Sequence, residues 1–242
     1  MIELSPLAWG MLGLAALIAG IGKTAVPGSA TVSVVLLAAV LPARTSTAAM
    51  LLLFIVGDVF ALIAYRRHAH WPTLLRLAPA VVAGLVLGFL FLSIGDDHLV
   101  RRAIGVILLV MIAITLWRRH RQAKAAGTAL GLTYGTLAGF TTMVANAGGP
   151  VMAMYFLATR TPVQVFLGTS AWFFAIVNLV KVPFLAGLGL FTPQVLLMDL
   201  VLAPLVVLGA LTGLMLAKRM PQRLFDRIVI VLTVLGAVYL LF

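Results

Sequence analysis

The chain has 242 residues, of which 63% are hydrophobic and 10% are charged, and its mean hydropathy is +1.19. A composition this apolar excludes a soluble globular domain and indicates an all-α integral membrane protein. The formal net charge of +11 comes from basic residues in short loops between apolar runs. That distribution is the positive-inside pattern of membrane proteins, so we expect no nucleic-acid partner.

Five helical elements are expected in the first half, from apolar runs at 7–22, 29–41, 45–65, 74–94 and 100–117. The run at 29–41 is too short to cross a hydrocarbon core of about 30 Å at about 1.5 Å per residue. Residues 20–29 (GIGKTAVPGS) separate the first two runs with helix-breaking glycine and proline. We therefore predict that these two runs form a re-entrant helix–break–helix. The basic loop at 118–124 is the expected joint between halves 1–124 and 125–242.

The second half repeats this order, with apolar runs at 129–144, 151–159, 163–185, 193–217 and 225–241. Its break lies in residues 139–150 (GFTTMVANAGGP), where Asn146 precedes two glycines and Pro150. Glycine is entropically costly within a helix, whereas proline suits the first turn of a new one. Because a broken backbone in lipid must be buried in protein or line a cavity, the two breaks together predict a binding site.

Matching residues indicate that the two halves are an internal repeat. Pro42 and Asp58 recur as Pro162 and Asn178 at one offset (178 − 58 = 120). A second offset (204 − 79 = 125) relates the pairs Pro79/Pro204, Gly84/Gly209, Gly88/Gly213 and Arg102/Arg227. The Gly-xxx-Gly pairs in this set are expected to let helices pack closely.

The distribution of charge predicts how the two halves are oriented. Placing the basic loops on the cytoplasmic face makes the helix with Asp58 run inward and the helix with Asn178 run outward. The expected fold is therefore an inverted-topology repeat of two five-element halves, each opening with a re-entrant helix–break–helix. Both termini would lie outside a bacterial inner membrane that the chain crosses several times, and the two breaks would meet near the midplane.

An anion-binding site is expected where the two breaks meet. Lys23 puts an ammonium at the first break, and such a charge within a membrane is costly unless it is paired or serves a function. The short helices that follow the breaks present free amides and positive dipole ends to an anion. The residues expected to contribute are Gly28, Ser29, Asn146, Gly148 and Gly149. Two alternatives stay open: Lys23 snorkels to the interface, and Ser29 and Asn146 are helix caps.

Further polar residues lie within the apolar runs. Asp58 is expected either to couple transport to protons or to form a structural ion pair with Lys23 or Lys181. Asn178 and Lys181 share a helix face and are expected to contact substrate, with an interfacial position of Lys181 as the alternative. Hydroxyl groups either donate to substrate or bond to their own helix. The hydroxyl candidates are Thr169, Ser170, Thr141 and Thr142.

These motifs resemble the TauE/SafE family of sulfite exporters and organosulfonate permeases. The resemblance lies in residues 22–28 (GKTAVPG), 145–150 (ANAGGP), 168–170 (GTS) and 178–183 (NLVKVP), together with Asp58 and the YRR at 65–67. It implies transport of a small sulfur-containing anion, sulfite or an organosulfonate, with export as the favoured direction. Many relatives carry a glycine cluster at the first break, so a contact with Lys23 is expected of this branch.

The expected function is a secondary transporter of this anion and not an enzyme. The chain has no P-loop motif for ATP hydrolysis, and its four histidines lie in predicted loops without metal-ligand company, so neither cofactor nor metal is expected. The expected partners are the small anionic substrate and the lipid bilayer, with a homodimer left open. Two alternatives remain: an anion channel, and an intramembrane hydrolase with Ser29 or Ser170 as nucleophile and Lys23 as base.

Overall fold

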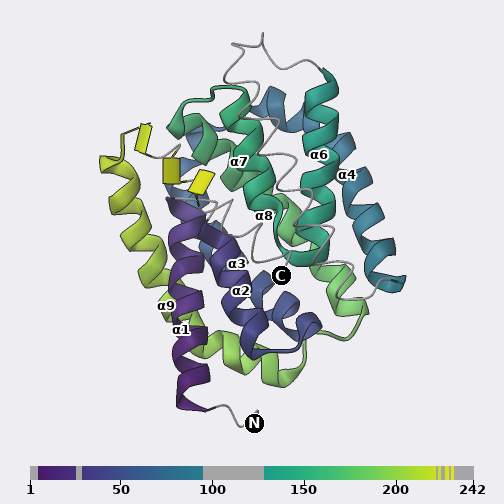
Figure 1. The fold of residues 1–242 in the computed structure, drawn as a ribbon, viewed down its shortest axis with the longest axis vertical. Coiled ribbons are helices and arrows are strands. Elements are labelled where there is room, and N and C mark those ends of the chain that lie inside the picture. Colours follow the sequence, from purple (N-terminus) through teal and green to yellow (C-terminus); the bar gives the residue numbers. More distant parts are fainter. Residues whose placement is uncertain are drawn as a thin grey trace.

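The computed structural model describes residues 5–25, 29–94 and 128–221, together with 223–224, 227–228 and 230–231. All regular structure in this part of the chain is helical (Figure 1). The elements are α1 (Pro6–Thr24), α2 (Ala30–Val40), α3 (Ala43–Tyr65), the 3₁₀ turn η2 (Arg66–His68), α4 (Trp71–Ile94), α6 (Thr128–Ala145), α7 (Gly148–Ala158), α8 (Val163–Gly187) and α9 (Pro193–Arg219).

Five of the described helices, α1, α3, α4, α8 and α9, are long and apolar enough to cross a membrane, whereas α2 and α7 are shorter apolar helices. The chain is therefore a multi-pass membrane protein. The predicted run at 100–117, the loop at 118–124 and most of the run at 225–241 lie outside the described residues.

Proline and hydroxyl side chains set the helix starts. Ser5 caps α1 by accepting from the Ala8 amide at 3.2 Å, and Thr192 caps α9 by accepting from the Val195 amide at 3.4 Å. Pro42 and Pro162, one of the repeat pairs, precede α3 and α8 with nearly the same backbone angles. Equivalent sequence positions in the two halves thus begin equivalent helices.

Both predicted breaks are confirmed as interruptions between helices. In the second, Asn146 has φ of 53°, a left-handed conformation that ends α6, and α7 starts at Gly148 with Pro150 in its first turn. The capping alternative is wrong for this break, because α7 has no side-chain cap and its N-cap residue is Ala147. Ser29 does occupy the N-cap position of α2, yet its side chain makes no capping hydrogen bond.

The helices pack in pairs that join the two halves of the sequence. α1 packs along α9, and α4 packs along α6. A Cβ on Gly20 would collide with the backbone of α9 at Val206, and a Cβ on Gly139 would collide with α4 at Val81. Val81 and Val206 are themselves related by the second repeat offset (206 − 81 = 125). The same close contact is therefore made twice, with the contributions of the two halves exchanged.

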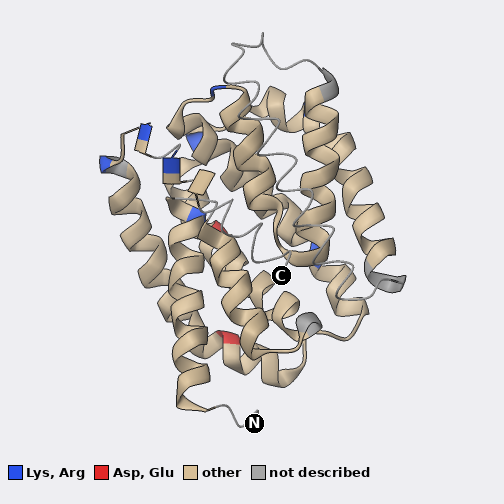
Figure 2. Ribbon diagram, in the orientation of Figure 1, with Lys and Arg blue, Asp and Glu red and all other residues tan. Residues whose placement is uncertain are grey.

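The bundle also has opposed helix directions and an uneven distribution of charge. α1 rises from the N-terminus at the bottom of Figure 1, whereas α6 starts at the top. Figure 2 shows that Lys and Arg outside the interior of the bundle gather at the upper end, opposite the N-terminus. α7 is nearly enclosed by protein, since every residue from Gly148 to Leu157 is buried. This burial shields the broken backbone beside it from lipid.

The expected packing role of the Gly-xxx-Gly pairs gives a first prediction. A Cβ on Gly84 or Gly209 would meet the main-chain oxygen of Thr136 or Leu17, so neither site accepts a side chain without separating two helices. We expect Gly84→Ala and Gly209→Ala each to destabilise the protein by about 1–3 kcal/mol. Gly10→Ala in α1 is the matched control, because no atom lies within 4 Å of the added Cβ. The measurement is thermal unfolding in detergent, and a control as unstable as the two variants would contradict the packing argument.

Candidate functional site

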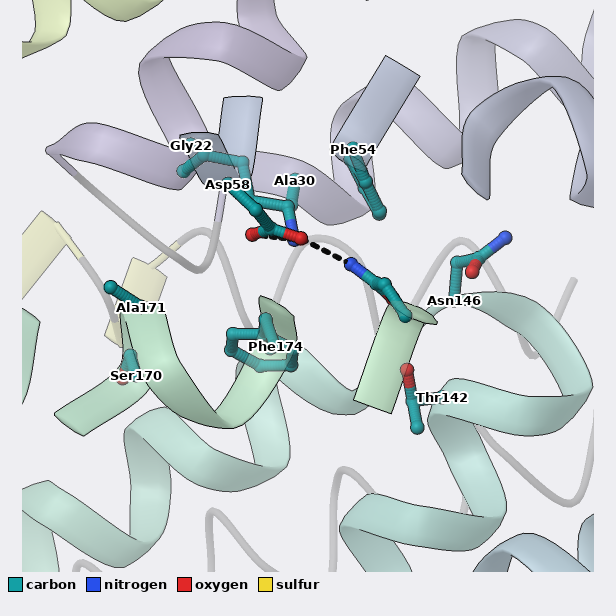
Figure 3. A pocket seen from close by; sticks show the side chains of 12 residues that line it. Gly22, Ala30, Phe54, Asp58, Thr142, Asn146, Ser170, Ala171 and Phe174 are labelled. Atoms are coloured by element: carbon teal, nitrogen blue, oxygen red, sulfur yellow. Dashed lines mark hydrogen bonds and ion pairs between the residues drawn. The ribbon is translucent and has the colours of Figure 1, made fainter. Parts of the chain in front are cut away.

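A small cavity lies where the two breaks approach each other in the interior (Figure 3). Its lining comes from six helices and from the second break, and consists of Gly22, Lys23, Ala30, Phe54, Asp58, Thr142, Asn146, Gly149, Ser170, Ala171, Phe174 and Asn178. The volume is about 20 Å³, enough for one or two water molecules. The space left between these side chains is therefore small.

An ion pair occupies the centre of the site. Lys23 Nζ lies 2.7 Å from Asp58 Oδ1, and the two side chains are only 7% and 4% exposed. The ammonium also lies 4.5 Å from the ring centroid of Phe54 and 4.8 Å from that of Phe174. Aromatic faces stabilise a cation at such distances. The alternative that Lys23 snorkels to the interface is therefore wrong, and the expected pairing of Asp58 with Lys23 is confirmed.

Contacts around Thr24 hold the lysine at this place. Thr24 donates to the main-chain oxygen of Ala210 at 2.9 Å, and its own main-chain oxygen accepts from the Tyr65 hydroxyl at 2.9 Å. The last turn of α1 is thereby fixed to α9 and to the end of α3. Lys23, one residue earlier, projects from this fixed turn into the cavity.

Asn178 joins the second half to the ion pair. Its side-chain amide donates to Asp58 Oδ2 at 2.6 Å, so Asp58 is ion-paired with α1 and hydrogen-bonded to α8 through different oxygens. Asp58 and Asn178 are the repeat pair that the sequence identified, and the structure brings the two into direct contact. The equivalent long helices α3 and α8 therefore meet at the site.

Lys181 has a different place from the one expected. Its side chain is fully buried, so the interfacial alternative is wrong. Lys181 Nζ donates to the main-chain oxygen of Thr142 at 2.6 Å and to Asn146 Oδ1, and Lys181 does not line the cavity. The Asn146 amide in turn donates to the main-chain oxygen of Thr47 at 3.0 Å. Lys181 and Asn146 thus hold the second break between α8 and α3.

The remaining candidates divide between the cavity and its surroundings. Ala30 and Gly149 bring the first turns of α2 and α7 to the cavity. Gly148 does not line the cavity and packs against Thr142, whose Cβ would lie 2.7 Å from a Cβ added to the glycine. Ser29 is buried but does not line the cavity. Gly28 lies outside the described residues.

The hydroxyl residues separate in the same way. Thr169 lies outside the cavity and accepts from the His70 amide at 2.9 Å, while Thr141 bonds to Leu137 of its own helix at 2.8 Å. Ser170 does line the cavity, and its hydroxyl is buried without a hydrogen-bond partner among the described residues. Of the hydroxyl candidates, Ser170 is therefore placed to meet a ligand, together with Thr142 on the opposite wall.

A comparison with protein families shows which family the chain belongs to. The model of the family described as "Sulfite exporter TauE/SafE" matches residues 12–240, nearly the whole length. The chain belongs to this family. No curated protein and no solved structure gave a match. TauE/SafE is a transporter family, in agreement with the membrane-length helices and the interior cavity of this member.

Two aromatic residues of the TauE/SafE site were missed by sequence reasoning. Phe54 and Phe174 flank the ammonium of Lys23, and each lies one helical turn before Asp58 or Asn178. They are related by the first repeat offset (174 − 54 = 120), which is a signal that was present in the sequence. Across the described residues, no group of His, Asp and Glu is suited to hold a metal ion.

The ion pair of this TauE/SafE protein gives a second prediction. Removing one partner leaves a buried charge alone, so Lys23→Met and Asp58→Leu should each destabilise the fold by about 3–5 kcal/mol. The double variant has no buried charge to leave unpaired at this position, and we expect its stability to return close to that of the unsubstituted protein. Thermal unfolding in detergent measures all three. A double variant no more stable than the single ones would show that the site depends on more than the pair.

Proposed function

We propose that this TauE/SafE protein is a secondary transporter that binds a small sulfur-containing oxyanion, sulfite or an organosulfonate, between α2 and α7 at the cavity. The observation that carries the proposal is the ammonium of Lys23 in an interior cavity that the first turns of both short helices also line. The family match suggests the sulfur chemistry. The geometry independently favours an anion.

The donors around the cavity suit an oxyanion. The first turns of α2 and α7 present main-chain amides that have no partner within the helix, and the helix dipoles add positive potential there. Ser170 supplies a hydroxyl that lacks a partner in the described structure. An oxyanion that leaves water needs several hydrogen-bond donors around its charged oxygens, because burial of an unpaired charge is prohibitive.

We infer in addition that the two halves are inverted repeats, each opening with a re-entrant pair, α1–α2 or α6–α7. The exchanged contacts of α1 with α9 and of α4 with α6 support this, as do the opposite starts of α1 and α6 in Figure 1. The basic end in Figure 2 would face the cytoplasm of a bacterial cell, with both termini outside. The description of the family favours export.

The small volume of the cavity supports a transporter over an open channel, since a conducting channel needs a continuous water-filled path. The ion pair also disfavours the hydrolase alternative. A lysine that acts as a base toward serine must be neutral, whereas Lys23 is engaged by a carboxylate at 2.7 Å.

Substrate affinity tests the proposed site. We expect Lys23→Ala to weaken binding of sulfite or methanesulfonate by about 2–3 kcal/mol, roughly 30- to 160-fold, because a charged donor is lost. Ser170→Ala should cost about 1 kcal/mol, as a neutral donor does. Thr169→Ala is the matched control, since that hydroxyl lies outside the cavity and should leave affinity unchanged. Calorimetric titration in detergent measures the three variants.

The transport function itself is tested in proteoliposomes. Uptake of sulfite, sulfate, thiosulfate, taurine and sulfoacetate should be compared with and without a pH gradient. Saturable uptake of a sulfur oxyanion that is lost in Lys23→Ala supports the proposal. Unchanged affinity and uptake in a monodisperse Lys23→Ala protein would place the substrate elsewhere.

The inverted repeat predicts a specific topology. A tag at the C-terminus should be accessible from outside the cell, whereas a tag after Arg121 should be accessible only after permeabilisation, because the basic loops are retained in the cytoplasm. Accessibility of both tags from the same side would contradict the inverted arrangement.

A further inference from the structure

We propose that the transported anion and Asp58 compete for the ammonium of Lys23, so that each anion binds together with one proton, which Asp58 takes up. This inference rests on the proposed function and specifies its coupling. It predicts proton–anion symport through a single site.

The competition between the anion and Asp58 follows from the charges of the residues that line the cavity. Among its described lining residues, Lys23 is the only cation and Asp58 the only anion, and they contact each other at 2.7 Å. With the pair closed, the cavity of about 20 Å³ has no room for an oxyanion of several heavy atoms. A substrate that binds to the ammonium must therefore separate it from the carboxylate.

Separation leaves Asp58 in an unfavourable state. Oδ1 loses its cationic partner, while the new anion stands in the same cavity between the rings of Phe54 and Phe174. Two neighbouring anions in a dry site repel each other, and a proton on one of them removes the repulsion. Asp58 is the group able to take that proton, because a sulfonate remains ionised.

The other charged groups near Asp58 do not replace Lys23. On α8, Asn178 is neutral, and Lys181 is already engaged by Thr142 and Asn146 outside the cavity lining. The described part of α2, which also packs on α3, has no titratable residue. On α9, Val206 faces Gly57, and the carboxyl of Asp199 lies seven residues away, about 10 Å along the helix.

Symport has a definite thermodynamic signature. If one proton binds with each anion, the apparent affinity falls up to about tenfold for each unit by which the pH rises, as linkage requires. Both species then cross in the same direction. An inward proton gradient drives uptake, so outward transport would have to draw on an outward gradient of the anion.

Calorimetric titration of the purified full chain in detergent tests this between about pH 6 and about pH 8. The probes are methanesulfonate and thiosulfate, whose charges do not change in this range, so that any linked proton belongs to the protein. We expect affinity to weaken about tenfold per pH unit, with uptake of about one proton per anion in weak buffer. In Asp58→Asn, which mimics the protonated carboxyl, affinity should be independent of pH and gradient-driven accumulation should be lost.

Asp199→Asn is the matched control. Asp199 is a buried carboxyl in α9 with no hydrogen-bond partner in the described structure, and its replacement should leave the pH dependence intact. Loss of the dependence in this variant would assign the proton to Asp199 and overturn the inference. Binding without proton uptake in the unsubstituted protein would also overturn it, while the proposed function would stand; this measurement decides even if Asp58→Asn fails to fold. If neither probe nor sulfite binds, the proposed function itself fails.

Discussion

The structure depends on keeping one ion pair inside an apolar bundle. An isolated charge at this depth costs several kcal/mol, so Lys23 and Asp58 must be held at contact distance and supplied with further partners. The supports come from several directions: Thr24 is fixed to α9 and to Tyr65, Asn178 reaches Asp58 from α8, and two rings flank the ammonium. A single polar contact thereby ties the first break to the long helices of both halves.

The second break is held by a lysine as well, but with a different consequence. Lys181 stabilises the end of α6 by donating to the main-chain oxygen of Thr142, which also accepts from the Asn146 amide. The ammonium of Lys23 instead faces the carboxylate of Asp58, which the substrate would displace under the proposed competition. The two buried lysines thus differ in position, because Lys181 supports the second break and only Lys23 lines the cavity.

Sequence reasoning found the helices and the breaks because glycine, proline and hydrophobic length act locally. It also found that Asp58 and Asn178 are equivalent, although not that they touch. It chose Thr169 as a candidate alongside Ser170, and the structure separates them because adjacent helical residues point about 100° apart. Thr169 contacts His70 instead of the cavity, and a contact so distant in sequence leaves no local pattern. The contacts of Lys181 with Thr142 and Asn146 were missed for the same reason, since these partners are distant in sequence.

The two halves differ in sequence at the charged positions of the site, and electrostatics gives the reason. Phe54 and Phe174 preserve their identity across the repeat, whereas Asp58 is matched by Asn178. At the breaks, the offset that relates Gly20 to Gly139 (139 − 20 = 119) matches Lys23 with Thr142. If both halves carried aspartate, two carboxylates would meet at the 2.6 Å contact that now joins an amide to a carboxylate, and one of them would have to stay protonated. Asparagine converts this repulsion into a hydrogen bond. It leaves one carboxylate matched to one ammonium, which is the balance that the proposed competition for Lys23 requires.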